Sequence, residues 1–237
     1  MKTLDLKEYG LTKYNGKDIF GYGNVRLAPH YYKYMLEKKA HGKSILDIGC
    51  GDGVIGTIVG DDTEYMGLDI GAGIYKEVEH KQIRYIRNHD ELMSAISEKK
   101  VDISILNNVL EHTFDFTDLF EKALENTNDM VMVSLPNEEN IHLRLSFLMG
   151  RGITSHTLDL VGSHVNHRHL WLVQIPKAEK ILTEIATRFQ FKLEEKSHYI
   201  AFPNTTWKKW LYMIGTRFLP WNVKARNFVL VFKKNKQ

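Results

Sequence analysis

The chain has a single cysteine, Cys50, in 237 residues, so no disulfide can form within it. One thiol in a chain of this length is typical of proteins in a reducing compartment. The sequence also has no run of about 18 apolar residues, the length that a transmembrane helix needs. These two absences predict a cytoplasmic protein that does not span a membrane.

The net charge of the chain is also low. The net charge is only +3, which is too small to indicate a nucleic-acid-binding surface, so we expect no nucleic-acid partner. Hydrophobic residues make up 43% of the chain and charged residues 26%, as in ordinary globular proteins. At this length the composition predicts one domain with a full hydrophobic core.

The most informative stretch is SILDIGCGDG, residues 44–53. Its apolar half predicts a buried strand, and three glycines then recur at alternate positions: Gly49, Gly51 and Gly53. Glycines let the chain turn sharply where a Cβ atom would collide with a ligand. Residues 54–59 are expected to form a helix whose N-terminal N–H groups face the same spot. A strand, a glycine loop and a helix in this order form a nucleotide-binding corner.

The spacing of the glycines distinguishes between nucleotides. A dinucleotide-binding loop needs Gly-x-Gly-x-x-Gly/Ala, and Val54 occupies the third glycine position here, which disfavours a nicotinamide-dependent oxidoreductase. The tripeptide Gly-Lys-Ser at 42–44 matches the end of a P-loop. However, it precedes the strand, and Glu37 stands where that motif requires its first glycine. A P-loop is therefore excluded.

The remaining pattern, Asp-x-Gly-x-Gly-x-Gly over 47–53, resembles motif I of the class I S-adenosylmethionine-dependent methyltransferases. The resemblance implies S-adenosyl-L-methionine as the cofactor and S-adenosyl-L-homocysteine as its product. It also implies a loop that makes room for the methionine end of the cofactor, with the acidic residue helping to hold the turn and the ammonium group. The cofactor-binding residues implied in this loop are Asp47, Gly49, Cys50, Gly51 and Gly53.

A second acidic residue supports this interpretation. Residues 63–68 predict a second strand that ends at Asp69, and a carboxylate there can accept both ribose hydroxyls of an adenosine. Ile70, which follows it, is expected at the cofactor too. The resemblance places the adenine near the residues that follow the third strand, and the register leaves three candidates for this position: Asn88, His89 or Asp90. After the fourth strand, the backbone of Asn107 and Asn108 is expected to border the cofactor.

Strands and helical segments alternate along the core. The predicted strands are 44–48, 63–68, 83–87, 101–106 and 129–134, followed by a helix over 177–189 and two long strands, 191–202 and 226–233. This order predicts an α/β fold, a doubly wound, mostly parallel sheet with helices on both faces. The resemblance implies a seven-stranded Rossmann-like methyltransferase sheet with one antiparallel strand near the C-terminus.

We expect a single methyltransferase domain over 1–237. Its parts are a helical N-terminal cover over 1–42, with a helix near 31–39, a cofactor-binding core over 43–135, and variable cap segments over 138–170 and 203–222.

The sequence Val-Leu-Glu-His at 109–112 resembles a methyltransferase subgroup that includes quinone-biosynthesis O-methyltransferases and enzymes of polysaccharide gene clusters. Some quinone O-methylating relatives hold a divalent metal with Glu-x-x-Glu-His. Here Asn108 replaces the first glutamate and lends no charge, so we assign no metal ligand. Glu111 and His112 are also compatible with capping the next helix and orienting the loop.

The pattern Ser-Leu-Pro-Asn at 134–137 is shared with the same relatives. Nucleic-acid amino methyltransferases instead carry Asn/Asp-Pro-Pro-Tyr/Phe after the fourth strand, and that motif is absent from this chain. The acceptor atom is therefore predicted to be oxygen.

Four histidines gather after the fifth strand: His156, His164, His167 and His169. The stretch 166–171 resembles a histidine-bearing segment of relatives that act on glycans, in which His167 is the best match. An imidazole can accept the proton of a hydroxyl acceptor as the methyl group transfers, so His167 and His112 are the catalytic candidates. The same histidines are compatible with a zinc cluster, or with structural or substrate-orienting roles.

The segment 204–221 has an apolar helical face with cationic neighbours, and is compatible with core packing, a lid, a dimer interface or peripheral contact with a membrane. A second apolar stretch, 142–149, favours a bulky or lipid-linked acceptor. The sequence thus predicts methyl transfer to a small-molecule, glycan or lipid-linked acceptor. The alternative, from a different functional class, is a non-catalytic subunit of the same fold that binds the cofactor and serves a partner protein.

Overall fold

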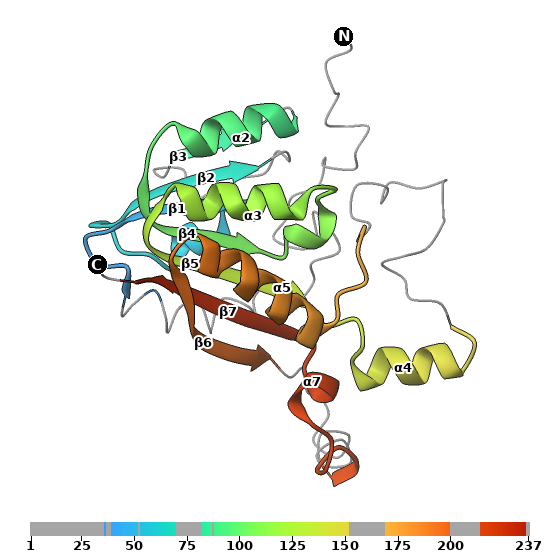
Figure 1. Cartoon of the computed structure of the whole chain (residues 1–237). Helices are drawn as coiled ribbons and strands as arrows, with labels where there is room; N and C mark the ends of the chain where they lie inside the picture. Colours follow the sequence, from blue (N-terminus) through green and yellow to red (C-terminus); the bar gives the residue numbers. More distant parts are fainter. Residues whose placement is uncertain are drawn as a thin grey trace.

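A computed structural model describes residues 36, 39–51, 53–69, 82–86, 88–151, 169–199 and 214–235. Its centre is a seven-stranded sheet in the order β3-β2-β1-β4-β5-β7-β6 (Figure 1). The strands are β1 (Ser44–Ile48), β2 (Glu64–Asp69), β3 (Gln82–Tyr85), β4 (Val101–Asn107), β5 (Thr127–Pro136), β6 (Phe191–Tyr199) and β7 (Asn227–Lys234). Strand β7 is antiparallel to both of its neighbours, and the other pairings are parallel. The predicted fold class is confirmed, including the antiparallel strand.

The order of the strands reverses at β1. This strand pairs with β2 on one side and β4 on the other, so that Asp47 lies between Gly67 and Ile105. The chain therefore leaves β1 and β4 in opposite directions, and such a point opens a crevice at the carboxyl ends of the strands. The glycine loop after β1 and the Asn107–Asn108 pair at the end of β4 both lie at this edge.

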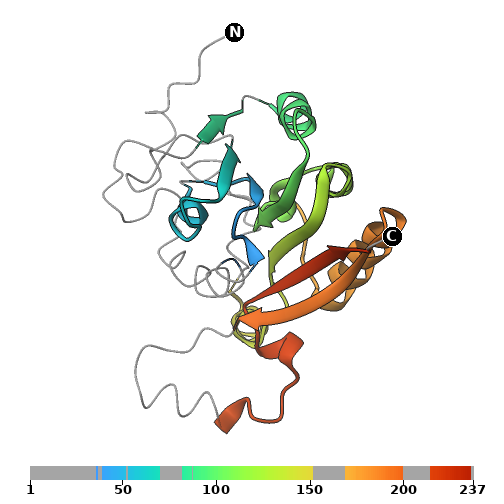
Figure 2. The same ribbon diagram turned by 90° about the vertical axis from the view of Figure 1, so that its left-hand side faces the viewer.

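Three helices cover one face of the sheet (Figures 1 and 2). They are α2 (His89–Ser97), α3 (Phe116–Glu125) and α5 (Ile175–Arg188). Helix α3 buries its apolar residues at helical spacing, namely Leu119, Phe120, Ala123 and Leu124. Helix α5 begins two residues before the predicted start, because Pro176 occupies its first turn, where no backbone N–H is needed.

The opposite face of the sheet has its own core. Ile103, Ile105 and Met132 pack there against Leu36 and Ile55, which come from outside the sheet. Leu36 is helical, as expected near 31–39, and much of the remaining N-terminal cover lies outside the described residues. The helix predicted over 54–59 is shorter than expected, since it is a single 3-10 turn, η2 (Val54–Thr57).

Two short helices lie beyond the carboxyl ends of the parallel strands (Figure 1). They are α4 (Ile141–Leu148), which Asn140 caps through its side chain, and α7 (Trp221–Lys224). Helix α4 lies within the cap segment expected over 138–170, and α7 begins within the one expected over 203–222 and ends two residues beyond it. The stretches 152–168 and 200–213 lie outside the described residues. None of the helices in the described part of the chain has the length and the apolar character that crossing a bilayer requires.

Candidate cofactor and metal site

The loop after β1 turns as its glycines predict. Gly49, Gly51 and Gly53 have φ angles of 71°, 58° and 79°, in the left-handed region that favours glycine. The N–H groups of Gly49 and Cys50 both donate to the carbonyl of Leu68, at 2.7 and 3.1 Å, which fixes the loop against the end of β2.

The glycines of this loop have different surroundings. Among the described residues, a Cβ atom on Gly51 would meet nothing within 4 Å, so the space beside this residue is open. A Cβ atom on Gly49 would lie 2.3 Å from Cγ2 of Val109, in the loop after β4. Gly49 is therefore required by packing between the two loops, and Gly51 borders space that a ligand can use.

Sequence reasoning missed a further glycine, Gly67 in β2. A Cβ atom there would lie 2.7 Å from Sγ of Cys50 and 3.3 Å from the hydroxyl of Tyr65. The buried thiol of Cys50 thus fills the space that a side chain on β2 would need. An isolated glycine inside a strand often marks such a close approach, and this was the available signal.

The two acidic residues predicted at the cofactor differ in position. Asp69 lies at the end of β2, where one carboxylate oxygen accepts a hydrogen bond of 2.6 Å from the N–H of Gly51. Asp47 is fully buried beneath the loop, and its carboxylate accepts a 2.7 Å hydrogen bond from the hydroxyl of Tyr65. Asp69 is thus placed beside the open turn, and Asp47 is bound to Tyr65 of the neighbouring strand β2. Ile70 lies outside the described residues.

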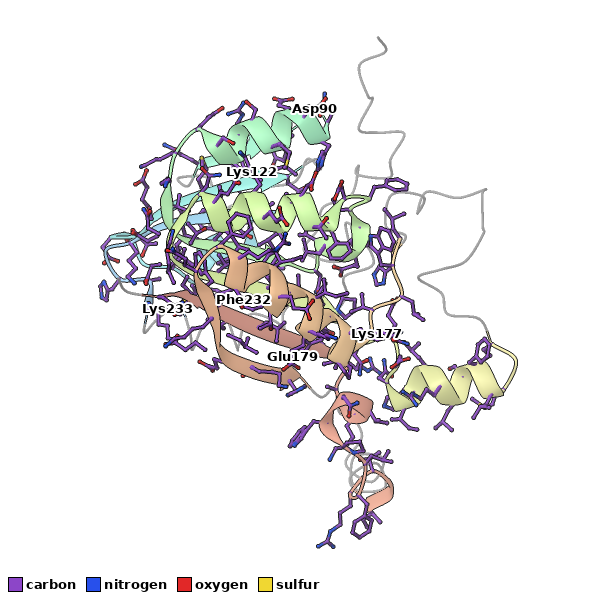
Figure 3. All side chains as sticks on the ribbon, viewed as in Figure 1. Asp90, Lys122, Lys177, Glu179, Phe232 and Lys233 are labelled. Atoms are coloured by element: carbon purple, nitrogen blue, oxygen red, sulfur yellow. The ribbon has the colours of Figure 1, made fainter. Side chains whose placement is uncertain are left out.

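The residues predicted near the adenine surround the start of α2. Asn88 caps this helix, because its side-chain oxygen accepts a hydrogen bond of 2.9 Å from the N–H of Glu91. His89 and Asp90 are exposed on the first turn, and Figure 3 shows Asp90 at the N-terminal end of α2. The contact of these three residues with an adenine stays a prediction.

The two asparagines at the end of β4, Asn107 and Asn108, belong to a hydrogen-bond network. The hydroxyl of Ser134 donates to the side-chain oxygens of Asn107, at 2.5 Å, and Asn108, at 3.3 Å. Asn227 of β7 donates to the same oxygen of Asn108 at 3.1 Å. Asn108 also adopts a left-handed φ of 54°, which turns the chain at this point. Both side chains are therefore engaged with the sheet, and their backbone lies at the edge where the cofactor was predicted.

A buried carboxylate follows this turn. Glu111 lies in a 3-10 turn, η4 (Leu110–His112), and is only 2% exposed. Its Oε2 atom has no hydrogen-bond partner among the described residues. Burial raises the pKa of Glu111 to about 8, and the negative charge of Glu138 acts in the same direction. The interpretation that Glu111 and His112 cap the next helix is wrong, because Asp115 caps α3 by accepting from the N–H of Asp118.

Two histidines lie beside Glu111. The rings of His112 and His169 meet edge to face, with their centroids 4.8 Å apart. Nδ1 of His169 lies 2.6 Å from Oε1 of Glu138, and the N–H of Val173 donates to the other oxygen of that carboxylate at 2.9 Å. One ligand atom from each of three residues lies within 4.8 Å of the others in this cluster, formed by Glu111, His112 and His169.

This cluster differs from the histidine set suggested by the sequence. His156, His164 and His167 lie outside the described residues, and His169 is grouped with Glu111 and His112 instead. Sequence reasoning missed Glu138, which is 4% exposed and directly follows the Ser-Leu-Pro-Asn motif. An acidic residue at the carboxyl end of a central strand was the available signal.

Solved methyltransferase structures share this fold at low sequence identity. A methyltransferase dependent on S-adenosylmethionine, from Archaeoglobus fulgidus, is 14% identical with a TM-score of 0.59, over 88% of this chain and 94% of that chain. The magnesium protoporphyrin IX methyltransferase from Synechocystis PCC 6803, with bound S-adenosylhomocysteine, is 12% identical with a TM-score of 0.53, over 89% and 83%. A third, the 1,6-didemethyltoxoflavin-N1-methyltransferase from Burkholderia thailandensis, is 11% identical with a TM-score of 0.52, over 90% and 80%. These likenesses establish the fold.

A search of curated proteins gives no match. The family model described as "Methionine biosynthesis protein MetW" matches residues 30–218, which is most of the chain and includes the glycine loop, β4, β5 and the Glu111 cluster. The subgroup of quinone and polysaccharide O-methyltransferases remains a prediction. By this match the protein belongs to the MetW family.

Proposed function

We propose that this protein is an S-adenosylmethionine-dependent methyltransferase. The observation that carries the proposal is the turn after β1, where Gly51 borders open space and its N–H is bound to the carboxylate of Asp69. The turn stands at the point where the strand order reverses, which is where ligands bind in doubly wound sheets.

In this proposal the glycine loop seats the methionine end of the cofactor and Asp69 binds the ribose. Two of the similar structures hold S-adenosylhomocysteine, which supports this choice of cofactor. The reaction is an in-line displacement at the sulfonium methyl group, and the protein chiefly aligns donor and acceptor. His112 and His167 are the candidates for accepting the proton of the acceptor.

The acceptor is proposed to be a small-molecule, glycan or lipid-linked hydroxyl compound. Oxygen is favoured by the absence of the amino-methyltransferase motif from the sequence. Large apolar side chains of the cap segments favour a bulky acceptor, since Phe147, Leu148 and Trp221 are 68%, 80% and 57% exposed. The segment 204–221 is also proposed to make peripheral contact with a membrane. Liposome co-sedimentation tests this contact, and a protein that stays in the supernatant contradicts it.

A second candidate is a cofactor-binding subunit that acts through a partner in methionine biosynthesis. The description of the family favours it, because that description names a biosynthetic role and no methyl transfer. Such a subunit would keep the glycine loop and bind the same nucleoside.

Calorimetry with S-adenosylmethionine, S-adenosylhomocysteine and NAD tests whether the chain binds the proposed cofactor. We expect binding of the first two and none of NAD, and a chain that binds none of them contradicts both candidates. Turnover is then measured with radiolabelled S-adenosylmethionine against a panel of glycan, quinone and phenol acceptors. Transfer of the label to an acceptor would establish the methyltransferase. Cofactor binding without transfer to any acceptor would favour the partner subunit.

A further inference from the structure

Three side chains from two distant parts of the sequence meet beyond the carboxyl end of β4. Glu111 and His112 come from η4, and His169 comes from the segment that leads into α5. The N–H of Leu170 donates to the carbonyl of Glu111 at 2.7 Å, which ties the two segments together. The ligand atoms of the three side chains lie within 4.8 Å of one another. The backbone therefore holds a carboxylate and two imidazoles in one place.

The carboxylate in this group is unusual. Glu111 is 2% exposed, and its Oε2 atom has no hydrogen-bond partner in the part of the chain that the structure describes. A buried polar atom without a partner loses its hydration and gains no hydrogen bond in return, so its presence needs an explanation. A cation bound between Glu111 and the two imidazoles would supply the missing interaction.

His169 is oriented in the manner of a metal ligand. Its Nδ1 atom lies 2.6 Å from Oε1 of Glu138, which makes Nε2 the nitrogen that a metal would take. Glu138 is itself held by the N–H of Val173. Histidines that bind metals commonly donate their other N–H to a carboxylate, which fixes the ring and strengthens it as a ligand. Glu138 is thus a positioning residue for His169.

The donor set selects the class of metal. Two imidazoles and one carboxylate suit zinc and its first-row neighbours, whereas magnesium and calcium prefer oxygen ligands. The set excludes Asn108, whose side-chain oxygen accepts hydrogen bonds from Ser134 and Asn227. It therefore differs from the Glu-x-x-Glu-His pattern, in which the residue at position 108 is a ligand.

We propose that Glu111, His112 and His169 bind one divalent first-row transition metal ion of the zinc class, with Glu138 holding His169. An ion about 2.1 Å from each ligand atom needs these atoms about 3.4 Å apart in tetrahedral geometry, so binding draws the most distant of them together by up to about 1.4 Å. Three protein ligands leave a fourth position for water or for an oxygen of a bound molecule. The inference does not depend on methyl transfer, and a His112 that binds the metal would leave His167 as the candidate for accepting the proton of the acceptor.

The full-length protein, dialysed against a chelator, is titrated with Co²⁺, whose visible absorption reports its coordination. We expect absorption bands that saturate at one ion per chain, are abolished by one equivalent of Zn²⁺, and persist in excess Mg²⁺. Absence of the bands, or their removal by Mg²⁺, overturns the inference. Binding of S-adenosylhomocysteine is measured on the same samples, so a failure of the metal site is distinguished from a failure of the proposed function.

Variants test whether the bound ion lies in this cluster. We expect His169→Ala and, separately, His112→Ala to lose the bands, and Glu138→Gln to weaken Co²⁺ binding by about 10–100-fold while keeping them. His41→Ala is the matched control, because His41 is also paired with a carboxylate, that of Asp62, but lies in the turn before β1. Circular dichroism confirms that each variant is folded. Unchanged Co²⁺ affinity in both cluster variants overturns the assignment.

Discussion

The carboxylate of Asp69 accepts a 2.6 Å hydrogen bond from the backbone N–H of Gly51. This contact joins the end of β2 to the glycine loop after β1. One oxygen of Asp69 is thereby engaged in holding the loop, and the same carboxylate is the group proposed to bind the ribose. The loop and the ribose site are therefore coupled through a single side chain.

Replacing Asp69 by asparagine tests this coupling. The amide oxygen of Asp69→Asn can still accept from Gly51, but the charge is lost and one acceptor becomes a donor. A hydrogen bond to a charged group contributes about 1.5–3 kcal/mol, so we expect S-adenosylhomocysteine to bind roughly 10–100-fold more weakly, with little change in melting temperature. Isothermal titration calorimetry measures the affinity.

The matched control is Asp102→Asn. Its carboxylate accepts from the N–H and hydroxyl of Ser44 at the opposite end of β1, so this change should lower stability without altering affinity. Equal weakening by the two variants would mean that Asp69 acts only through stability, and unchanged affinity in Asp69→Asn would remove it from the ribose site.

A second prediction separates backbone strain from ligand space. Gly51 and Gly42 have similar φ angles of 58° and 65°, and a Cβ atom on either would meet nothing within 4 Å. Alanine at either position should cost about 1–2 kcal/mol of stability, because both adopt a left-handed backbone. Only Gly51→Ala should also weaken S-adenosylhomocysteine binding, by about tenfold or more.

Chemical unfolding and calorimetry on the two variants give both quantities. Gly49 is unsuitable for this test, since its Cβ atom would strike Val109 and disturb the fold. If Gly51→Ala binds the cofactor product as well as Gly42→Ala does, the space beside Gly51 is not where the methionine end lies.

A third prediction concerns the packing of Cys50 against β2. In Gly67→Ala, the new Cβ atom would lie 2.7 Å from Sγ and 3.1 Å from Cβ of Cys50. Overpacking of this kind costs about 1–3 kcal/mol of unfolding free energy. Cys50→Ala should recover part of that loss in the double variant, because it removes the closer of the two contacts. A double-mutant cycle from urea unfolding measures the coupling, and strictly additive effects would contradict it.

The parts of the fold that the sequence predicts well are local. Strand β1 and its glycines are encoded by residues next to one another, and the strand has the predicted boundaries. The helix predicted after them is only a 3-10 turn, where Gly56 and the β-branched Val54, Ile55 and Thr57 are weak α-helix formers. Glu111 does not cap α3, because Asp115, four residues later, offers a better N-cap side chain.

The cluster around Glu111 was beyond sequence reasoning for a different reason. Glu138 and His169 are 31 residues apart, and Glu111 reaches them only once β4 and β5 are paired. No spacing rule connects positions so distant, whereas the glycine motif needs only ten consecutive residues. The Tyr65–Asp47 hydrogen bond is non-local for the same reason, since it spans two strands.

The last prediction concerns acid stability at the other end of the sheet. Burial opposes the ionisation of Asp129, but hydrogen bonds from Lys233 and Lys43, each 2.5 Å long, outweigh it and lower the pKa of Asp129 below its ordinary value of 3.8. Figure 3 shows Lys233 at the end of β7 remote from α4. A carboxyl group whose pKa falls on folding stabilises the native state above its unfolded pKa, and this stabilisation is lost as the pH falls through the folded value.

Asp129→Asn should therefore lower the free energy of unfolding near neutral pH, by about 1 kcal/mol at most, because the three side chains are partly exposed and screened by solvent. The difference from the native protein should shrink to zero in strong acid, where Asp129 is protonated in both states. Urea unfolding over a pH series measures it, with Glu125→Gln, in an exposed pair with Lys122, as the control expected to change less. A difference that stays constant down to strong acid would show that the side chain stabilises β5 by packing and not by its charge.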